Sequence, residues 1–222
     1  MLQKIKEKGH YQAFFITLAL AAVVFLPFII YDKGIFFFYG DFNVQQIPFY
    51  KLAHEAIRPG DIAWNWYTDL GANFIGSYSF YLLFSPFFWL TLPFPTEAVP
   101  FLIGPLLMLK TACAALTSYF YIKRFVKDQY YAVIGSILYA FSGFAVYNIF
   151  FNHFHEVIVF FPLLLIGVEE LVTNNRKGLF AITVAINCLV NYWFFIGEVV
   201  FVMLYVFLRM TDRSWGMTVK RF

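Results

Sequence analysis

Residues Tyr11–Tyr31 form an apolar run of 21 residues that contains no charged side chain. A helix of this length spans about 30 Å, which matches the hydrocarbon core of a bilayer. The run is too long for the apolar core of a secretory signal, and it lacks an Ala-x-Ala-like cleavage site. We therefore predict a retained signal-anchor helix that crosses a membrane.

The rest of the chain is also apolar. Its 222 residues are 61% hydrophobic and 23% aromatic, and only 13% are charged. A soluble domain of this length needs more charge to cover its surface. The predicted fold is an all-α, polytopic bundle of transmembrane helices. Its further spans lie within residues 100–208, at Phe101–Ile122, Tyr130–Phe151, Val157–Val168 with its flanks, and Gly178–Leu208.

The run Gly178–Leu208 allows two interpretations. It is too long for one untilted span and too short for two full ones. One long tilted helix and a tight hairpin that turns near Asn191–Gly197 are both open. Either form places Glu198 at the outer membrane boundary.

Basic residues predict the orientation, because Lys and Arg gather in cytoplasmic loops. They put the N-terminus in the cytoplasm, and residues 32–98 and 152–156 outside. This pattern requires that Phe74–Phe94 does not cross but forms a re-entrant or surface-lying part of the first outer loop, which agrees with Gly76, Pro86, Pro93 and Pro95 within or beside it. The alternative is that Phe74–Phe94 is a true span and that one Lys/Arg loop departs from the rule. The basic residues are Lys4, Lys6, Lys8, Lys123, Arg124, Lys127, Arg176 and Lys177.

The net charge of +3 does not indicate binding to nucleic acid, since the basic residues flank apolar runs. Cys113 and Cys188 lie inside apolar segments and match no metal-binding spacing. We interpret both as small apolar side chains and predict no disulfide between them.

Asp41 lies ten residues beyond the first span, with Gln45 close by in sequence. A carboxylate at a membrane surface can act as a general base or bind a divalent cation. The alternative is an ordinary loop acid or a helix N-cap, since Asp favours the N-cap position. The sequence leaves the two alternatives open.

Asn152 begins a second polar cluster, which continues through His153, His155 and Glu156. His-x-His-Glu is a weak metal signal, because residues two apart point in different directions on a helix. A divalent-cation site formed by His153, His155 and Glu156 is one interpretation. A polar cap on the following helix is the other.

Lys110 lies within the predicted span Phe101–Ile122, about 20 Å from the cytoplasmic boundary. Ionisable groups inside a membrane are costly and are commonly functional. Lys110 could contact the phosphate of a lipid-linked substrate, pair with Glu198, or reach the interface by snorkelling. For Glu169 and Glu170 we predict an ordinary solvated face.

The predicted outer loop contains an aromatic stretch with Trp64, Trp66 and Asp69. Aromatic planes and carboxylates of this kind bind sugar rings, although Trp and Tyr also gather at membrane interfaces. We predict substrate binding there. Gln46–Arg58 has the pattern of a short amphipathic helix on the membrane surface, and Pro59-Gly60 ends it.

Several motifs occur together in a recognisable order. Gly40-Asp41-Phe42-x-x-Gln45 precedes Gly71-Ala72-Asn73-Phe74 and Ser85-Pro86-Phe87, followed by Leu109-Lys110, Tyr139 to Gly143, and Asn152 to Glu156. In this order the chain resembles the YfhO family of bacterial membrane proteins, over nearly all of its length.

That resemblance implies a glycosyltransferase of the GT-C type in the bacterial cell membrane, with several spans and a cytoplasmic N-terminus. Asp41 matches the catalytic acid of the first outer loop. The cluster from Asn152 to Glu156 matches the second-loop polar or metal-binding residues, with Mg²⁺ or Mn²⁺ as the implied cation. Gln45, Trp64, Trp66, Asp69, Lys110 and Glu198 are the expected substrate-binding residues. The implied partners are a polyprenyl-phosphate sugar donor, membrane lipid, and a cell-surface polymer acceptor of the teichoic or lipoteichoic acid kind.

Family members are several times longer, so residues 1–222 are expected to correspond to an N-terminal part of a GT-C-like module. Two other functions remain open at this point. One is a transporter or flippase for a lipid-linked substrate, in which Lys110 and Glu198 are binding or gating charges. The other is a truncated, non-catalytic membrane partner.

Overall fold

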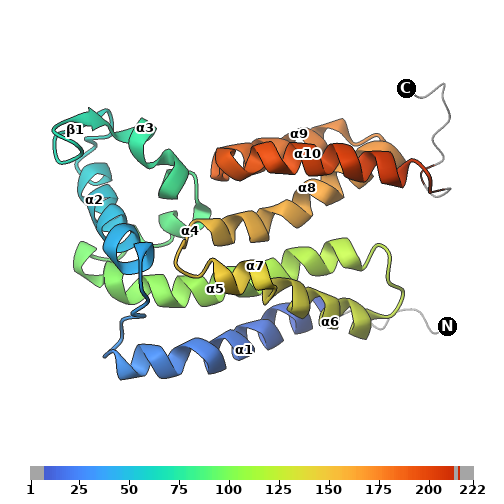
Figure 1. The fold of residues 1–222 in the computed structure, drawn as a ribbon, viewed down its shortest axis with the longest axis horizontal. Coiled ribbons are helices and arrows are strands. Elements are labelled where there is room, and N and C mark those ends of the chain that lie inside the picture. Colours follow the sequence, from blue (N-terminus) through green and yellow to red (C-terminus); the bar gives the residue numbers. More distant parts are fainter. Residues whose placement is uncertain (1–7, 213–214, 216–222) are drawn as a thin grey trace.

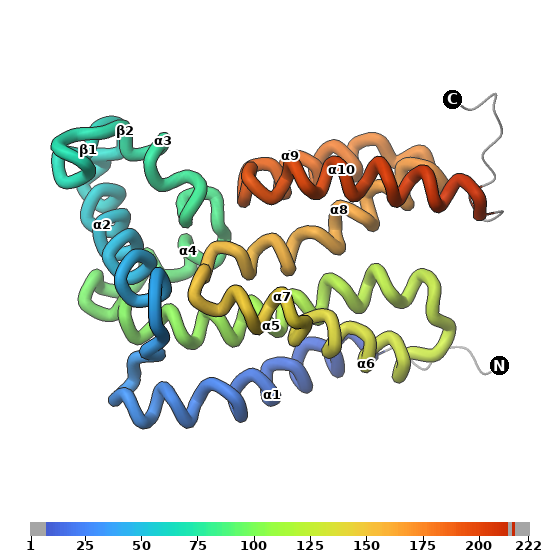
Figure 2. The backbone as a smooth tube through the Cα atoms, in the orientation of Figure 1, coloured from blue at the N-terminus to red at the C-terminus, as the bar shows by residue number. Residues whose placement is uncertain are grey.

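A computed structural model describes residues 8–212 and residue 215. The predicted basic residues Lys4 and Lys6 and the last three residues, Lys220 to Phe222, lie outside this part. The fold is an all-α bundle of long helices that run side by side, as predicted (Figure 1, Figure 2). The long helices are α1 (Gly9–Tyr31), α5 (Val99–Ile122), α6 (Gln129–Ala140), α8 (Phe154–Asn174), α9 (Lys177–Val190) and α10 (Tyr192–Arg209).

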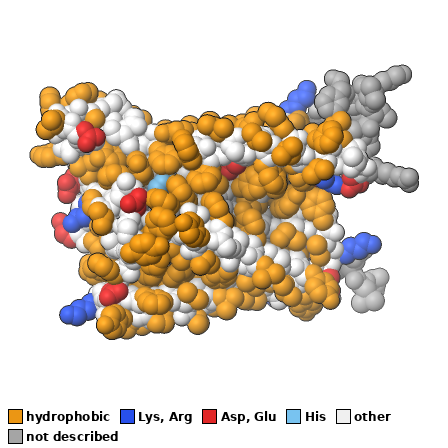
Figure 3. Space-filling model, in the orientation of Figure 1, with side chains coloured by type: hydrophobic (Ala, Val, Ile, Leu, Met, Phe, Trp, Pro, Cys, Tyr) orange, Lys and Arg blue, Asp and Glu red, His pale blue; other side chains and the backbone are white. Residues whose placement is uncertain are grey.

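Four helical segments in the described part of the chain are long and apolar enough to cross a membrane. They are Gly9–Tyr31, Thr96–Ile122, Gln129–Tyr147 and Tyr192–Arg209. The predicted span Tyr130–Phe151 is interrupted, because Ser142 caps a separate short helix, α7 (Gly143–Tyr147), by accepting a hydrogen bond from the Ala145 N–H. Large apolar side chains are exposed on these helices and cover the face seen in Figure 3, as expected for contact with lipid.

The run Gly178–Leu208 is a helical hairpin, and the alternative of one long helix is wrong. The backbone turns at Asn191, whose side chain accepts a hydrogen bond from the Phe194 N–H at 3.2 Å and caps α10. Helices α9 and α10 then run back beside each other (Figure 1). The turn lies at the start of the segment where a hairpin was expected.

Residues 32–98 cover one end of the bundle, which we call the α2 end (Figure 1). The other end, called the opposite end, carries Lys8 and residues 123–128 and 175–176. The α2 end contains η1 (Phe42–Gln46, a π-helix), α2 (Ile47–Ile57), β1 (Trp64–Asn65), β2 (Ala72–Asn73), α3 (Phe74–Tyr78), η2 (Ser79–Leu83, a π-helix), α4 (Pro86–Trp89) and η3 (Thr96–Ala98). The two strands pair antiparallel, with Trp64 opposite Asn73.

Helix α2 lies across the direction of the long helices, as expected for a helix on a membrane surface (Figure 1). Its polar face is not fully solvated, however. His54 is completely buried, and its Nε2 lies 2.8 Å from Thr91 Oγ1. Arg58 donates a hydrogen bond to Thr96 Oγ1 at 2.9 Å. These contacts attach α2 to the segment that leads into α5.

Residues 74–94 form only short helices, in agreement with the prediction that this segment does not cross. Asn73 caps α3 by accepting from the Gly76 N–H, and Ser85 caps α4 by accepting from the Phe88 N–H. Each cap starts a new helix in a new direction. The segment therefore stays at the α2 end (Figure 1).

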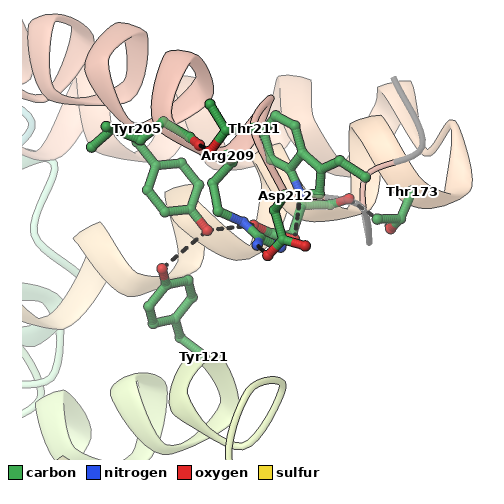
Figure 4. A network of polar contacts seen from close by, with 9 residues as sticks. Tyr121, Thr173, Tyr205, Arg209, Thr211 and Asp212 are labelled. Atoms are coloured by element: carbon green, nitrogen blue, oxygen red, sulfur yellow. Dashed lines mark hydrogen bonds and ion pairs between the residues drawn. The ribbon is translucent and has the colours of Figure 1, made fainter. Parts of the chain in front are cut away.

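The prediction of a solvated face at Glu169 and Glu170 is wrong, because both side chains are buried at the opposite end. Figure 4 shows the polar network around Tyr205 and Arg209 at this end. Glu169 accepts hydrogen bonds from Tyr205 and from Arg209 of α10. Glu170 pairs with Arg124 at 2.7 Å. Glu170 also pairs with its sequence neighbour Arg176 at 3.3 Å. The partners Tyr205, Arg209 and Arg124 are distant in sequence and could not be recognised from it.

Accessibility of introduced cysteines tests the path of residues 74–94. In a variant with Cys113 and Cys188 replaced by Ala, single cysteines at Tyr67 and Glu97 should react with an impermeant reagent from the same side. A cysteine at Lys127 should react only from the other side. All three native side chains are exposed. Labelling of position 97 from the same side as position 127 would show that the segment crosses.

Candidate functional site

A buried ion pair joins α5 to the start of α8. Lys110 Nζ lies 2.8 Å from Glu156 Oε1, and both side chains are almost completely buried. Lys110 also donates to the backbone oxygen of Asn152 at 3.0 Å and to its Oδ1 at 2.9 Å. All three ammonium protons therefore have acceptors, which is the condition for a lysine to remain charged away from water.

Two residues of the α2 end extend this network. Asn152 Nδ2 donates to the Tyr50 hydroxyl at 3.2 Å, and Ser85 Oγ donates to Glu156. Burial raises the pKa of Tyr50 well above its usual value, with a further contribution from the Glu156 charge. We call Tyr50, Ser85, Lys110, Asn152 and Glu156 the polar lock. It connects α2, the segment before α4, α5 and the segment before α8.

The lock corrects the predicted roles of Lys110. Its ammonium does not snorkel to the interface, and its partner is Glu156 and not Glu198. Because Lys110 is fully buried and its three donors are used, a substrate phosphate cannot reach it without breaking the lock.

The predicted metal site at His153, His155 and Glu156 is wrong in its geometry. Among the described residues, no group of three or more His, Cys, Asp or Glu side chains is arranged to hold a metal ion. The Glu156 carboxylate pairs with Lys110 and accepts a hydrogen bond from Ser85. His153 packs instead among aromatic rings, with ring centroids 4.8 Å from Phe80 and 5.1 Å from Tyr81.

Asp41 directly precedes η1, and its side chain is partly exposed. It makes no side-chain capping hydrogen bond, so the alternative role as an N-cap is not realised, whereas the alternative of an ordinary loop acid stays open. Within residues 8–212 nothing hydrogen-bonds to the Asp41 carboxylate or pairs with it. Gln45 lies one turn further on, where its Oε1 accepts from Gln46 Nε2 at 3.1 Å.

At the α2 end, the charge of Asp41 acts on the hydroxyl group of one tyrosine, Tyr81. Burial raises the pKa of Tyr81, and the negative charge of Asp41 raises it further, which places the two groups near each other. Tyr192, at the start of α10, also raises the pKa of Tyr81. The ring centroids of Tyr192 and Phe80 lie 5.4 Å apart. We call Asp41, Tyr81, His153 and Tyr192 the Asp41 site. It joins the first loop, the second polar cluster and the α9–α10 turn.

The π-helical geometry of η1 and η2 contributes to this arrangement. The π-turn adds a residue to the helical repeat, so side chains before and after it face differently than in an α-helix. Asp41 precedes one such turn, and Tyr81 lies within the other. No sequence pattern predicts either turn, and neither Tyr81 nor Tyr192 was predicted as a site residue.

Trp64, Trp66 and Asp69 do not share the Asp41 site. They lie at and just beyond β1, at the far end of α2 from η1 (Figure 1), about 24 Å away along the helix. The two indoles pack edge to face with centroids 5.8 Å apart, and Trp66 is largely exposed. The backbone has positive φ at Asp69, Leu70 and Gly71. If these residues bind sugar, they bind a separate part of the substrate.

Glu198 also lies apart from the polar lock. It follows Tyr192, the first residue of α10, by six positions. Along the helix axis it therefore lies about 9 Å from the α9–α10 turn. Its side chain lines a mostly apolar groove with Tyr139 and Ser142.

Comparison with known proteins agrees with the sequence motifs. The family model described as bacterial membrane protein YfhO matches residues 13–222. The chain belongs to the YfhO family. This confirms the resemblance and supports a location in the bacterial membrane.

A relative in this family is the "Uncharacterized protein YfhO" of Bacillus subtilis (strain 168). It is 25% identical over 195 residues, which cover 77% of this chain and 21% of the relative. The chain therefore spans about a fifth of the length of that relative. No solved structure matches the chain.

His153 gives the α2 end a pH-dependent stability. Burial, followed by the charges of Lys110 and His155, lowers the pKa of His153 from 6.5 to about 3. Below pH 6.5 the unfolded chain binds a proton that the folded chain does not bind. The contribution of His153 to the free energy of unfolding is therefore fully present above pH 6.5. It falls as the pH decreases toward 3, by at most about 1.4 kcal/mol per pH unit.

His153→Phe keeps an aromatic ring and removes this titration. We expect its melting temperature in detergent to vary less between pH 7 and pH 4.5 than that of the native protein. An identical pH dependence in the two proteins would show that His153 is not held neutral by burial.

Proposed function

We propose that this chain carries the catalytic acid of an enzyme that transfers a sugar from a polyprenyl-phosphate donor to a cell-surface polymer. The observation behind the proposal is Asp41, a partly exposed carboxylate without a protein partner in the described part of the chain, fixed where two loops meet at one end of a membrane bundle. An unpaired carboxylate in such a place is available as a general base.

In the proposed reaction, Asp41 removes the proton from an acceptor hydroxyl group. The acceptor oxygen forms a bond to the anomeric carbon of the donor sugar. The bond from that carbon to the phosphate oxygen breaks, and the lipid phosphate leaves with the electron pair. A single displacement of this kind inverts the anomeric configuration.

The polar lock has a positioning role in this proposal. It attaches α2, and with it η1 and Asp41, to the segment before α8 through the Tyr50–Asn152 hydrogen bond, and it attaches the start of α4 to α8 through the Ser85–Glu156 hydrogen bond. A catalytic group has to be held within about 0.5 Å of its productive position. The donor phosphate has to be bound by other groups at the α2 end, because Lys110 is not free.

A divalent cation does not enter the proposed steps. Mg²⁺ and Mn²⁺ prefer carboxylate oxygens. The cluster at His153, His155 and Glu156 offers buried imidazoles and a carboxylate that already pairs with Lys110. These residues do not fit the implied ion.

The reaction is proposed for the extracytoplasmic side. The basic residues Lys123, Arg124 and Lys127 belong to the opposite end of the bundle, and the positive-inside rule puts that end in the cytoplasm. The α2 end then faces outward, where lipid-linked sugars and surface polymers meet.

The alternative of a transporter or flippase has less support. It uses Lys110 and Glu198 as mobile charges within the membrane. Lys110 is fixed in the polar lock, so only Glu198 remains available for such a role. A non-catalytic partner would leave the unpaired Asp41 without a function.

Asp41→Asn in the complete protein tests the proposal. The amide keeps the shape of the side chain and loses its basicity, so sugar on the surface polymer should fall by at least about 100-fold, the usual contribution of a general base. Polymer glycosylation is measured in cells, with the amount of membrane-inserted protein determined in parallel.

Asp61→Asn is the matched control, because Asp61 is an exposed acid at the same α2 end. It should leave glycosylation unchanged. Normal glycosylation in the Asp41→Asn variant at normal expression would contradict the assignment of Asp41.

A further inference from the structure

A groove of about 290 Å³ lies between α10 and the segments α6, α7 and α8. Its walls are mainly aromatic and aliphatic, with Phe144, Phe161 and Phe201 among them. Two of its walls, the segment Gln129–Tyr147 and helix α10, are long and apolar enough to cross a membrane, so the groove lies beside lipid-facing helices. The surface over α7 and α10 in Figure 3 is correspondingly apolar.

One carboxyl group interrupts this apolar lining. Glu198 lines the groove and is 7% exposed, and its Oε2 has no hydrogen-bond partner among the described residues. A buried polar atom without a partner is unfavourable, so natural proteins rarely retain one without a reason. A hydrogen-bond donor in the groove would satisfy it.

Gly197 keeps the groove open beside this carboxyl group. It lies within α10, where glycine is less favourable than alanine. An added Cβ at Gly197 would meet no atom within 4 Å, so neither packing nor backbone conformation requires glycine here. The missing side chain leaves space next to Glu198.

We propose that this groove binds a single apolar chain of a membrane lipid that carries a hydrogen-bond donor, a hydroxyl or ammonium group, which binds Glu198. The volume is near the lower limit of ligand pockets, about 300–1,000 Å³, and suits one chain. The Tyr139 and Ser142 hydroxyl groups line the same groove. This inference does not depend on the sugar-transfer reaction.

Photo-labelling of the complete protein in membrane vesicles tests the proposal. The probes are a long-chain alcohol, the amine of equal length and the corresponding methyl ether, each with a diazirine on the chain. The alcohol or the amine should label peptides of α10 about three to ten times more than the ether, the range expected for one hydrogen bond. Equal labelling by all three probes would overturn the proposal.

Two pairs of variants make the test specific. Gly197→Leu places a side chain in the groove and should abolish labelling, whereas Gly178→Leu, at another open position on α9, should not. Glu198→Leu should reduce labelling to the level of the ether. Glu198→Gln keeps an acceptor oxygen and should retain labelling by the alcohol.

Unchanged labelling in Gly197→Leu would place the lipid elsewhere. An absence of labelling in the native protein would indicate that another protein segment covers the groove. Either result would overturn the proposal. Normal labelling in the Asp41→Asn variant would separate this site from the catalytic one.

Discussion

The ion pair between Lys110 and Glu156 joins α5 to α8 at the point where hydrogen bonds attach the α2 end to the bundle. Both charges are removed from water and lipid, a cost that only close pairing and further hydrogen bonds can offset. Asn152 and Ser85 supply those bonds, and Asn152 extends the network to Tyr50. A covering loop of some sixty residues is thus attached to the spanning helices through buried polar groups as well as apolar contacts.

This attachment explains how the two candidate sites arise on one scaffold. The Asp41 site forms where the first loop, the second polar cluster and the α9–α10 turn meet, and its carboxylate is left unpaired. The Glu198 groove lies between α10 and the segments α6, α7 and α8, beside the break between α6 and α7. In both places the described residues leave a carboxyl oxygen without a hydrogen-bond partner, at Asp41 and at Glu198 Oε2. Membrane proteins rarely retain such acids without a function.

The first span and the span that contains Lys110 could be predicted from sequence, because long apolar runs form long apolar helices. The predicted span at Val157–Val168 is not among the four segments found long and apolar enough to cross a membrane in the described part of the chain. The non-crossing segment 74–94 followed from prolines and from the distribution of Lys and Arg. The partners of Lys110, Glu169 and Glu170 could not be predicted in this way. They depend on the rotation of each helix about its axis and on residues 36 to 46 positions away, such as Glu156 and Arg209. The π-turns beside Asp41 and Tyr81 likewise depend on tertiary packing.

A double-mutant cycle on Lys110→Met and Glu156→Leu tests the polar lock most directly. Unfolding of the purified protein in detergent is measured for both single variants and for the double variant. Each single change leaves one buried charge unpaired and should cost about 3–5 kcal/mol. The double variant should be more stable than the sum of the two losses predicts, by about 1–3 kcal/mol. Small, additive effects would mean that the ion pair does not hold the α2 end to the bundle.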